Sequence, residues 1–106
     1  MRIVIADDAV LLREGAARLL EDAGHEVVAQ AGDADDLLRK VRAHKPDVAI
    51  IDVRMPPDNT DDGLRAALTL RSEMPGLGVL LLLLPRGVFG GLHIAFNHIP
   101  DPKTDK

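Results

Sequence analysis

The chain has 106 residues, which fits one domain around one core, and its 46% hydrophobic and 28% charged residues are typical of a globular protein. A net charge of −4 gives no basic surface for nucleic acid, and two Phe with neither Trp nor Tyr argue against base stacking. The absence of Cys excludes disulfides, thiolate metal sites and thiol nucleophiles, and it is compatible with a reducing compartment.

The chain begins with a strand followed by a helix. Residues 3–6 form a short apolar run, and residues 9–23 repeat apolar side chains at helical spacing. Asp8 is the expected N-cap of this helix, and Gly24 is its expected C-terminal stop. The expected core-facing residues are Leu12, Ala16, Leu19, Leu20 and Ala23, and the expected solvent face is Arg13, Glu14, Arg18 and Glu21.

A second strand and helix follow directly. Residues 27–31 predict the strand, and residues 34–44 predict the helix, with Asp33 as its N-cap. Pro46 ends this helix because proline cannot donate the backbone hydrogen bond that the helix requires. The apolar stripe that should face the core comprises Leu37, Leu38 and Val41.

The third strand is predicted over residues 47–51, and its apolar composition is typical of a central position in a sheet. After a polar loop at 53–62, residues 63–74 predict a third helix, and residues 78–84 predict a fourth strand. One side of the third helix should carry Leu64, Ala67, Leu68 and Arg71. The alternation of strands and helices predicts an α/β domain with a parallel sheet and helices on both faces.

The pattern breaks near residue 84. From Pro85 onward no amphipathic helix is found, although alternation over residues 92–99 is compatible with a fifth strand. We therefore divide the chain into a regular core at 1–84 and a divergent tail of the same domain at 85–106. The longest apolar run, residues 79–84, is too short to span a bilayer, and no signal-peptide pattern precedes it, so we expect a cytoplasmic protein.

Three aspartates stand where predicted strands stop. Asp7 and Asp8 follow the first strand, and Asp52 follows the third. Ligands of open α/β sheets bind outside the carboxyl ends of the strands, so these side chains should meet there. Clustered carboxylates repel one another unless a cation neutralises them or one takes up a proton, and oxygen ligands favour Mg²⁺ over Zn²⁺.

With these residues in place, residues 1–84 resemble the receiver domain of bacterial two-component response regulators. The resemblance is strongest to the subfamily that carries a LuxR/NarL-type helix-turn-helix, and Asp8 and Asp52 are 44 positions apart (52 − 8), as in receivers. The resemblance implies a flavodoxin-like (CheY-like), doubly wound parallel sheet whose C-terminal helix-strand-helix part is incomplete here. The matching stretches are residues 3–8, 46–56 and 62–63.

The resemblance also implies roles for individual residues. Asp52 corresponds to the acceptor that receives a phosphoryl group from the phosphohistidine of a sensor histidine kinase, with Mg²⁺ as cofactor. Asp8 corresponds to a direct Mg²⁺ ligand, Asp7 to a neighbour acting through water, and the backbone carbonyl of Arg54 to a further ligand. It thus implies a signalling module in transcription regulation and not an enzyme.

The chain departs from the receiver pattern at two positions of the site. Leu83 stands where receivers carry a Ser or Thr at the end of the fourth strand, and neither Lys103 nor Lys106 matches the lysine that follows the fifth strand. The loop at 57–61 is longer than usual, which should alter access to the site more than its chemistry. The DNA-binding output domain is absent, so we expect no direct binding of nucleic acid by this chain.

The departures leave an alternative open, a pseudo-receiver that binds other proteins without phosphoryl transfer. A metal-dependent phosphatase is disfavoured because Arg54 stands where a second carboxylate would follow Asp52. A metal site at His93 and His98 is also disfavoured, because the two histidines are five positions apart and the sequence offers no third ligand beside them. An incomplete sheet would leave residues 80–84 as an exposed edge, and the loss of a helix would favour a homodimer.

Overall fold

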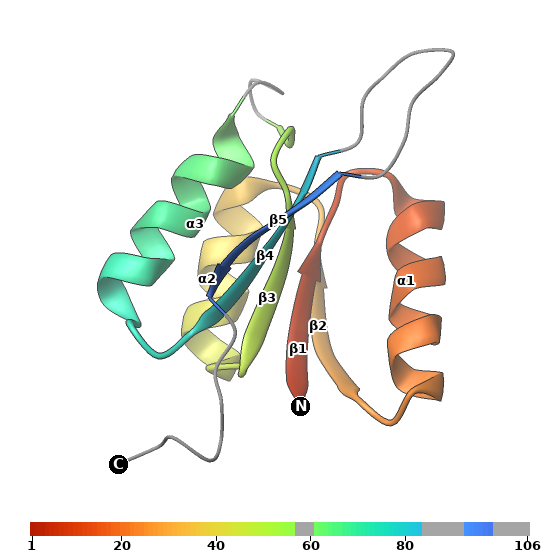
Figure 1. Ribbon diagram of the computed structural model, residues 1–106. Helices are drawn as coiled ribbons and strands as arrows, with labels where there is room; N and C mark the ends of the chain where they lie inside the picture. Colours follow the sequence, from red (N-terminus) through yellow and green to blue (C-terminus); the bar gives the residue numbers. More distant parts are fainter. Residues whose placement is uncertain (57–60, 84–92, 99–106) are drawn as a thin grey trace.

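The computed structural model describes residues 1–56, 61–83 and 93–98 of the chain. Within these residues a five-stranded sheet has the order β2-β1-β3-β4-β5. Helix α1 lies on one face of this sheet, and helices α2 and α3 lie on the other (Figure 1). The elements are β1 (Arg2–Ala6), α1 (Val10–Asp22), β2 (Glu26–Ala31), α2 (Ala34–His44), β3 (Val48–Asp52), α3 (Asp62–Glu73), β4 (Gly78–Leu83) and β5 (His93–His98).

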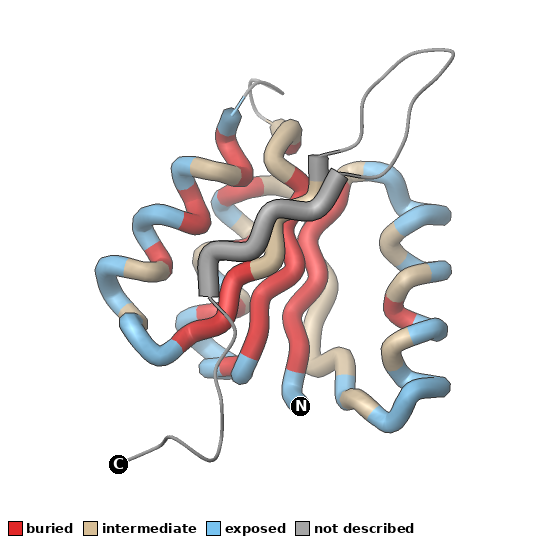
Figure 2. The backbone as a smooth tube through the Cα atoms, viewed as in Figure 1, coloured by how far each residue is buried: buried red, intermediate tan, exposed pale blue. Residues whose placement is uncertain are grey.

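Strands β1 to β4 are mutually parallel, as the alternation of strands and helices predicted. The two central strands, β1 and β3, are buried along almost their whole length because helices cover both faces (Figure 2). Strand β5 pairs with β4 in the antiparallel direction, so the expected parallel arrangement holds only for the first four strands. Because β5 pairs with β4, the sheet continues beyond β4, and the exposed edge expected of an incomplete sheet does not form at residues 80–83.

Two hydrophobic clusters lie on opposite faces of the sheet. The larger cluster joins α2 and α3 to the strands and includes Leu37, Val41 and Leu70, all fully buried. The smaller cluster joins α1 to the strands and contains Ile3, Ile5, Val48 and Ile50 as its buried members. Alternate residues of the same strands supply the two clusters, since successive side chains of a strand point to opposite faces.

The second helix matches its prediction. It spans residues 34–44, and the Asp33 side chain accepts a hydrogen bond of 2.7 Å from the backbone N–H of Asp36. Its acidic first turn and basic last turn also suit the helix dipole. Lys45 closes the helix in the left-handed conformation, with φ of 48°, directly before Pro46.

The first helix differs from its prediction in two ways. Its N-cap is Ala9 and not Asp8, and the backbone N–H of Ala9 is bound by the Asp7 carboxylate. Ala17 is its buried residue, whereas Leu12 and Leu19 of the predicted core stripe are exposed. The spacing of apolar residues identifies one side of a helix, but it does not predict how much of that side the sheet buries. Gly24 follows the helix at a φ of +96°, as expected of its C-terminal stop.

The third helix is rotated relative to its predicted apolar side. Leu68 is 59% exposed, and the side chains that face the core are those of Ala66, Ala67 and Leu70. Arg71, placed on the apolar side by the prediction, donates a hydrogen bond of 2.8 Å to the carbonyl of Leu77. The prediction was therefore right for Ala67, wrong for Leu68, and it missed Ala66 and Leu70.

Two further expectations concern parts of the tail. The candidate fifth strand at 92–99 overlaps β5, while residues 84–92 and 99–106 lie outside the described residues. None of the helices in the described ranges has the length and apolar character needed to cross a membrane.

Candidate functional site

The acidic site lies at the carboxyl edge of two adjacent parallel strands. In the pairing of β1 with β3, Ala6 stands opposite Ile51, so the residues that follow these two are neighbours. Asp7, Asp8 and Asp52 each bring one carboxylate oxygen to within 4.8 Å of the others. The parallel sheet therefore unites all three predicted aspartates, although 44 positions separate Asp8 from Asp52 in the sequence.

Asp7 is the most enclosed of the three, with 2% of its surface exposed. Its Oδ1 accepts a hydrogen bond of 2.8 Å from the backbone N–H of Ala9, which fixes the start of α1. Its Oδ2 is buried, and none of the described residues donates a hydrogen bond to it. Burial raises the pKa of Asp7 above its usual range, against the opposing effect of the Ala9 N–H, and the charge of Asp8 raises it further.

Asp52 is the last residue of β3 and is 6% exposed. Its Oδ1 accepts a hydrogen bond of 3.1 Å from the backbone N–H of Arg54, two residues along the chain. This bond holds the carboxylate at the edge of the sheet and brings the backbone of Arg54 beside it. Asp8 is half-buried, so the cluster has two enclosed carboxylates and one that faces toward solvent.

The donor set of this cluster fits a hard divalent cation. All of its ligand atoms are oxygens, and the three aspartates could carry up to three negative charges within a few ångströms of one another. The buried Oδ2 of Asp7 has no hydrogen-bond donor among the described groups, so it needs either a bound cation or a proton on the carboxyl group. Mg²⁺ satisfies both requirements, since it binds carboxylates and keeps several waters at its open side.

Gly63 explains how α3 approaches the site so closely. A Cβ atom at this position would lie 1.9 Å from the carbonyl oxygen of Asp52, well inside any allowed contact. The backbone N–H of Gly63 also donates a hydrogen bond of 2.9 Å to the carbonyl of Val53. Only glycine allows the first turn of α3 to support the backbone that carries Asp52. The sequence resemblance singled out Gly63 but gave no physical reason for it.

Arg13 is a contributor that the sequence prediction placed on the solvent face. Its Nη1 donates a hydrogen bond of 2.8 Å to the backbone carbonyl of Asp7, and its Nε donates one of 3.0 Å to the Gln30 side chain. The guanidinium thus ties α1 to the ends of both β1 and β2. No pattern in the sequence marks this role, because Arg13 and Gln30 are 17 positions apart.

The end of β4 lies beside the acidic cluster. Asp52 pairs with Leu82 in the sheet, so Leu83 is the residue that follows directly at the site edge. Leucine carries no hydroxyl group, and this position therefore offers no hydrogen-bond donor from a side chain. Lys103 and Lys106 lie outside the described residues.

The chain is similar in sequence to proteins of known families. The family model of the response regulator receiver domain matches residues 3–83. The oxygen regulatory protein NreC of Staphylococcus haemolyticus is 40% identical over 85 residues, which cover 79% of this chain and 38% of NreC. The transcriptional regulatory protein PdtaR of Mycobacterium tuberculosis is 39% identical over 72 residues, which cover 68% of this chain and 34% of PdtaR. The chain spans about a third of the length of these relatives.

Solved structures agree with the sequence relatives. The signal receiver domain of the NarL response regulator from Mycobacterium tuberculosis matches with a TM-score of 0.69 and 41% identity, covering 77% of this chain and 64% of that one. The receiver domain of RcsB from Salmonella enterica, solved with the phosphomimetic BeF₃⁻, gives a TM-score of 0.72 at 26% identity, covering 82% and 64%. Both likenesses cover about four fifths of this chain.

Proposed function

Because the chain belongs to the response regulator receiver domain family, we propose that it accepts a phosphoryl group on Asp52 in two-component signalling. The donor would be the phosphohistidine of a sensor histidine kinase, and the cofactor would be Mg²⁺. The observation that carries the proposal is the enclosed cluster of Asp7, Asp8 and Asp52, with the buried Oδ2 of Asp7 lacking a donor among the described residues.

In the proposed step, a carboxylate oxygen of Asp52 attacks phosphorus, and the bond between phosphorus and the histidine nitrogen breaks. The ring leaves with the electron pair, and it departs as neutral imidazole because its other nitrogen carries a proton in the reacting phosphohistidine. The backbone N–H of Arg54 orients the Asp52 carboxylate through Oδ1, and Gly63 supports its backbone from behind. When bound at this cluster, Mg²⁺ would neutralise the charge that develops on the phosphoryl oxygens.

The remaining residues of the cluster would hold the cation. Asp8 is the proposed direct ligand because it is the least buried of the three, and Asp7 would act from the enclosed side. The backbone carbonyl of Arg54 is the proposed further ligand, since the Arg54 N–H already anchors this segment to Asp52. Asp52 completes the set, so the acceptor and the cation share one site.

A second function is favoured by Leu83. A side-chain hydroxyl at the end of β4 would stabilise a phosphoryl oxygen, and the loss of one such donor costs roughly 10²–10³ in rate. If this loss prevents transfer, the chain would be a pseudo-receiver that binds a partner protein without phosphorylation. The two functions differ in one measurable property, the formation of an aspartyl phosphate.

The test is the intact mass of the protein after incubation with acetyl phosphate, with Mg²⁺ or with a chelator. A phosphoryl acceptor gives one Mg²⁺-dependent adduct that is absent from Asp52→Asn. Asp35→Asn is the matched control because Asp35 is exposed on α2 and is not one of the clustered carboxylates, so this variant should keep the adduct. Circular dichroism on each sample shows that the chain is folded.

The Leu83 departure can be tested in the same assay. Leu83→Thr restores a hydroxyl at this position and should increase the rate of adduct formation by about 10²-fold if the donor is what the site lacks. A folded wild-type chain that forms no adduct with Mg²⁺ would contradict the phosphoacceptor function and leave the pseudo-receiver as the better account.

A further inference from the structure

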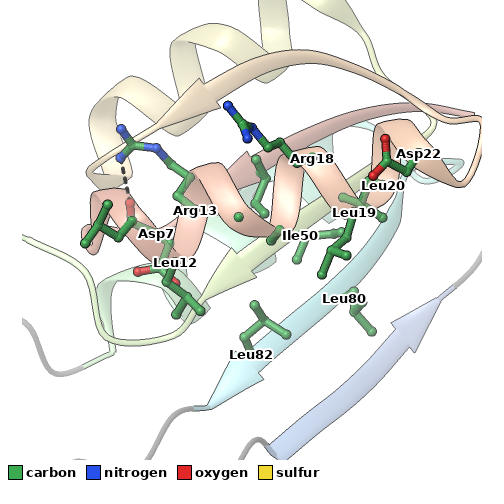
Figure 3. A pocket seen from close by; sticks show the side chains of 14 residues that line it. Asp7, Leu12, Arg13, Arg18, Leu19, Leu20, Asp22, Ile50, Leu80 and Leu82 are labelled. Atoms are coloured by element: carbon green, nitrogen blue, oxygen red, sulfur yellow. Dashed lines mark hydrogen bonds between the residues drawn. The ribbon is translucent and has the colours of Figure 1, made fainter.

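The face of the sheet beneath α1 carries an apolar groove. It has a volume of about 860 Å³ and lies between α1 and the strands β1, β3 and β4. Figure 3 shows Leu12 and Leu19 of α1 on one side of the groove and Leu80 and Leu82 of β4 on the other. Leu80 and Leu82 are only partly buried, so part of this side of β4 remains accessible.

The helix that borders the groove also carries most of the exposed apolar surface of the described residues. Leu11 is 88% exposed and Leu19 is 72% exposed, and Val10 and Leu12 are exposed as well. Besides Met1 and Leu68, these are the large hydrophobic side chains that the described part of the chain leaves exposed. An apolar groove and an apolar ridge therefore lie side by side on one 13-residue helix.

The sequence of α1 is nearly symmetric about its midpoint. Leu11-Leu12-Arg13 is mirrored by Arg18-Leu19-Leu20, with the small residues at 15–17 between them. In an antiparallel pair centred between residues 15 and 16, the exposed Leu12 of each copy comes level with the exposed Leu19 of the other. Small residues stand at the centre, where two helix backbones approach most closely, and nothing lies within 4 Å of a Cβ built on Gly15.

Charges along the helix are compatible with the same pairing. Arg18 of one copy comes to within one residue of the level of Glu14 of the other. Arg13, which would otherwise face Arg18 of the second copy, is held by its hydrogen bonds to the Asp7 carbonyl and the Gln30 side chain.

We propose that a second copy of this chain occupies the groove, in a two-fold dimer in which the α1 helices lie antiparallel. The exposed leucines of each α1 then pack toward Leu80 and Leu82 of the other copy. A two-fold interface is self-complementary, because each contact of one residue with another occurs twice. This interface goes beyond the proposed phosphoacceptor function and does not depend on it.

The first test is sedimentation velocity of the 106-residue chain over a range of concentrations. Wild type should form a dimer, and Leu19→Glu should weaken it by about 100-fold or more, because a charge would be buried at the symmetric contact. Leu68→Glu is the matched control, since Leu68 is also an exposed leucine but lies on α3. This control should dimerise as wild type does.

A cross-linking test remains informative even if Leu19→Glu fails to fold. The chain has no Cys, so a single cysteine in each chain forms disulfides only between copies. Gly15→Cys should give a cross-linked dimer under mild oxidation, and Ser72→Cys on the exposed side of α3 should not. A chain that is monomeric at all concentrations, or one that cross-links at residue 72 and not at residue 15, would overturn the proposal.

Discussion

The two faces of the sheet are built from the same strands, yet they are closed to different extents. On the α2 and α3 face, Leu37, Val41 and Leu70 are fully buried in one continuous cluster. On the α1 face, the buried cluster consists of strand residues, and the leucines at 11 and 19 remain exposed beside a groove. Strand composition therefore does not decide which face is closed; the number and placement of the helices on that face do.

The two faces also differ in the contacts that they make with the backbone of the acidic site. The backbone of Asp52 is held from the closed face, where Gly63 of α3 approaches it. On the open face, the Arg13 side chain connects α1 to the Asp7 backbone. If this comparison is right, contacts on the closed face should contribute more to the free energy of unfolding than contacts on the α1 face.

The largest expected effect is the loss of a large side chain from the closed face. Leu37→Ala should lower the free energy of unfolding by about 3 kcal/mol, because it leaves a cavity in a fully buried cluster. Leu20→Ala on the partly buried side of α1 should lower it by only about 1 kcal/mol. Urea unfolding at one fixed protein concentration measures both, and equal losses would remove the distinction between the faces.

The next effect concerns the contact between α3 and the site. Gly63→Ala places a Cβ against the Asp52 carbonyl and should cost about 2–3 kcal/mol of stability, because backbone must move to accept it. Gly76→Ala is the control, since nothing lies within 4 Å of its added Cβ. A Gly63→Ala variant that unfolds at the same urea concentration as wild type would show that α3 does not press on the site.

A smaller effect is expected at Asp7, which follows β1 at the carboxyl edge of the sheet. Its raised pKa means that the folded protein without Mg²⁺ holds the proton more tightly than the unfolded chain does, so stability is lost as pH rises through the raised pKa. Asp7→Asn should therefore stabilise the Mg²⁺-free protein at neutral pH by about 1 kcal/mol and remove most of the stabilisation by Mg²⁺. Thermal unfolding with Mg²⁺ and with a chelator measures both changes; destabilisation of the Mg²⁺-free variant would contradict the prediction.

Effects of the same size or smaller are expected at the N-terminal caps of the two helices on the closed face. Asp33→Ala should lower the free energy of unfolding by about 1 kcal/mol, because the Asp36 N–H loses its acceptor. Asp61 stands at the corresponding position of α3 without a side-chain capping bond and forms an exposed pair with Arg65. Asp61→Ala should therefore cost less, roughly 0.5 kcal/mol, and the reverse order in urea unfolding would contradict this assignment.

Much of this arrangement could be predicted from residue patterns. The span of α2, its Asp33 cap and the four parallel strands followed from periodicity and from the position of Pro46. The meeting of the three aspartates followed from the rule that parallel strands end at one edge. The exposed ridge of α1 could not be predicted, because the same spacing suits a helix that is covered and one that is not.

The sequence alone determined where strands and helices form and which carboxylates reach the edge of the sheet, since both depend on local pattern and on strand direction. Tertiary structure alone decided that the Oδ2 of Asp7 is buried without a donor among the described residues, and that Gly63 must lack a side chain. It also decided that Arg13 reaches the Asp7 backbone. These features depend on distances between segments far apart in the chain, which no local pattern encodes.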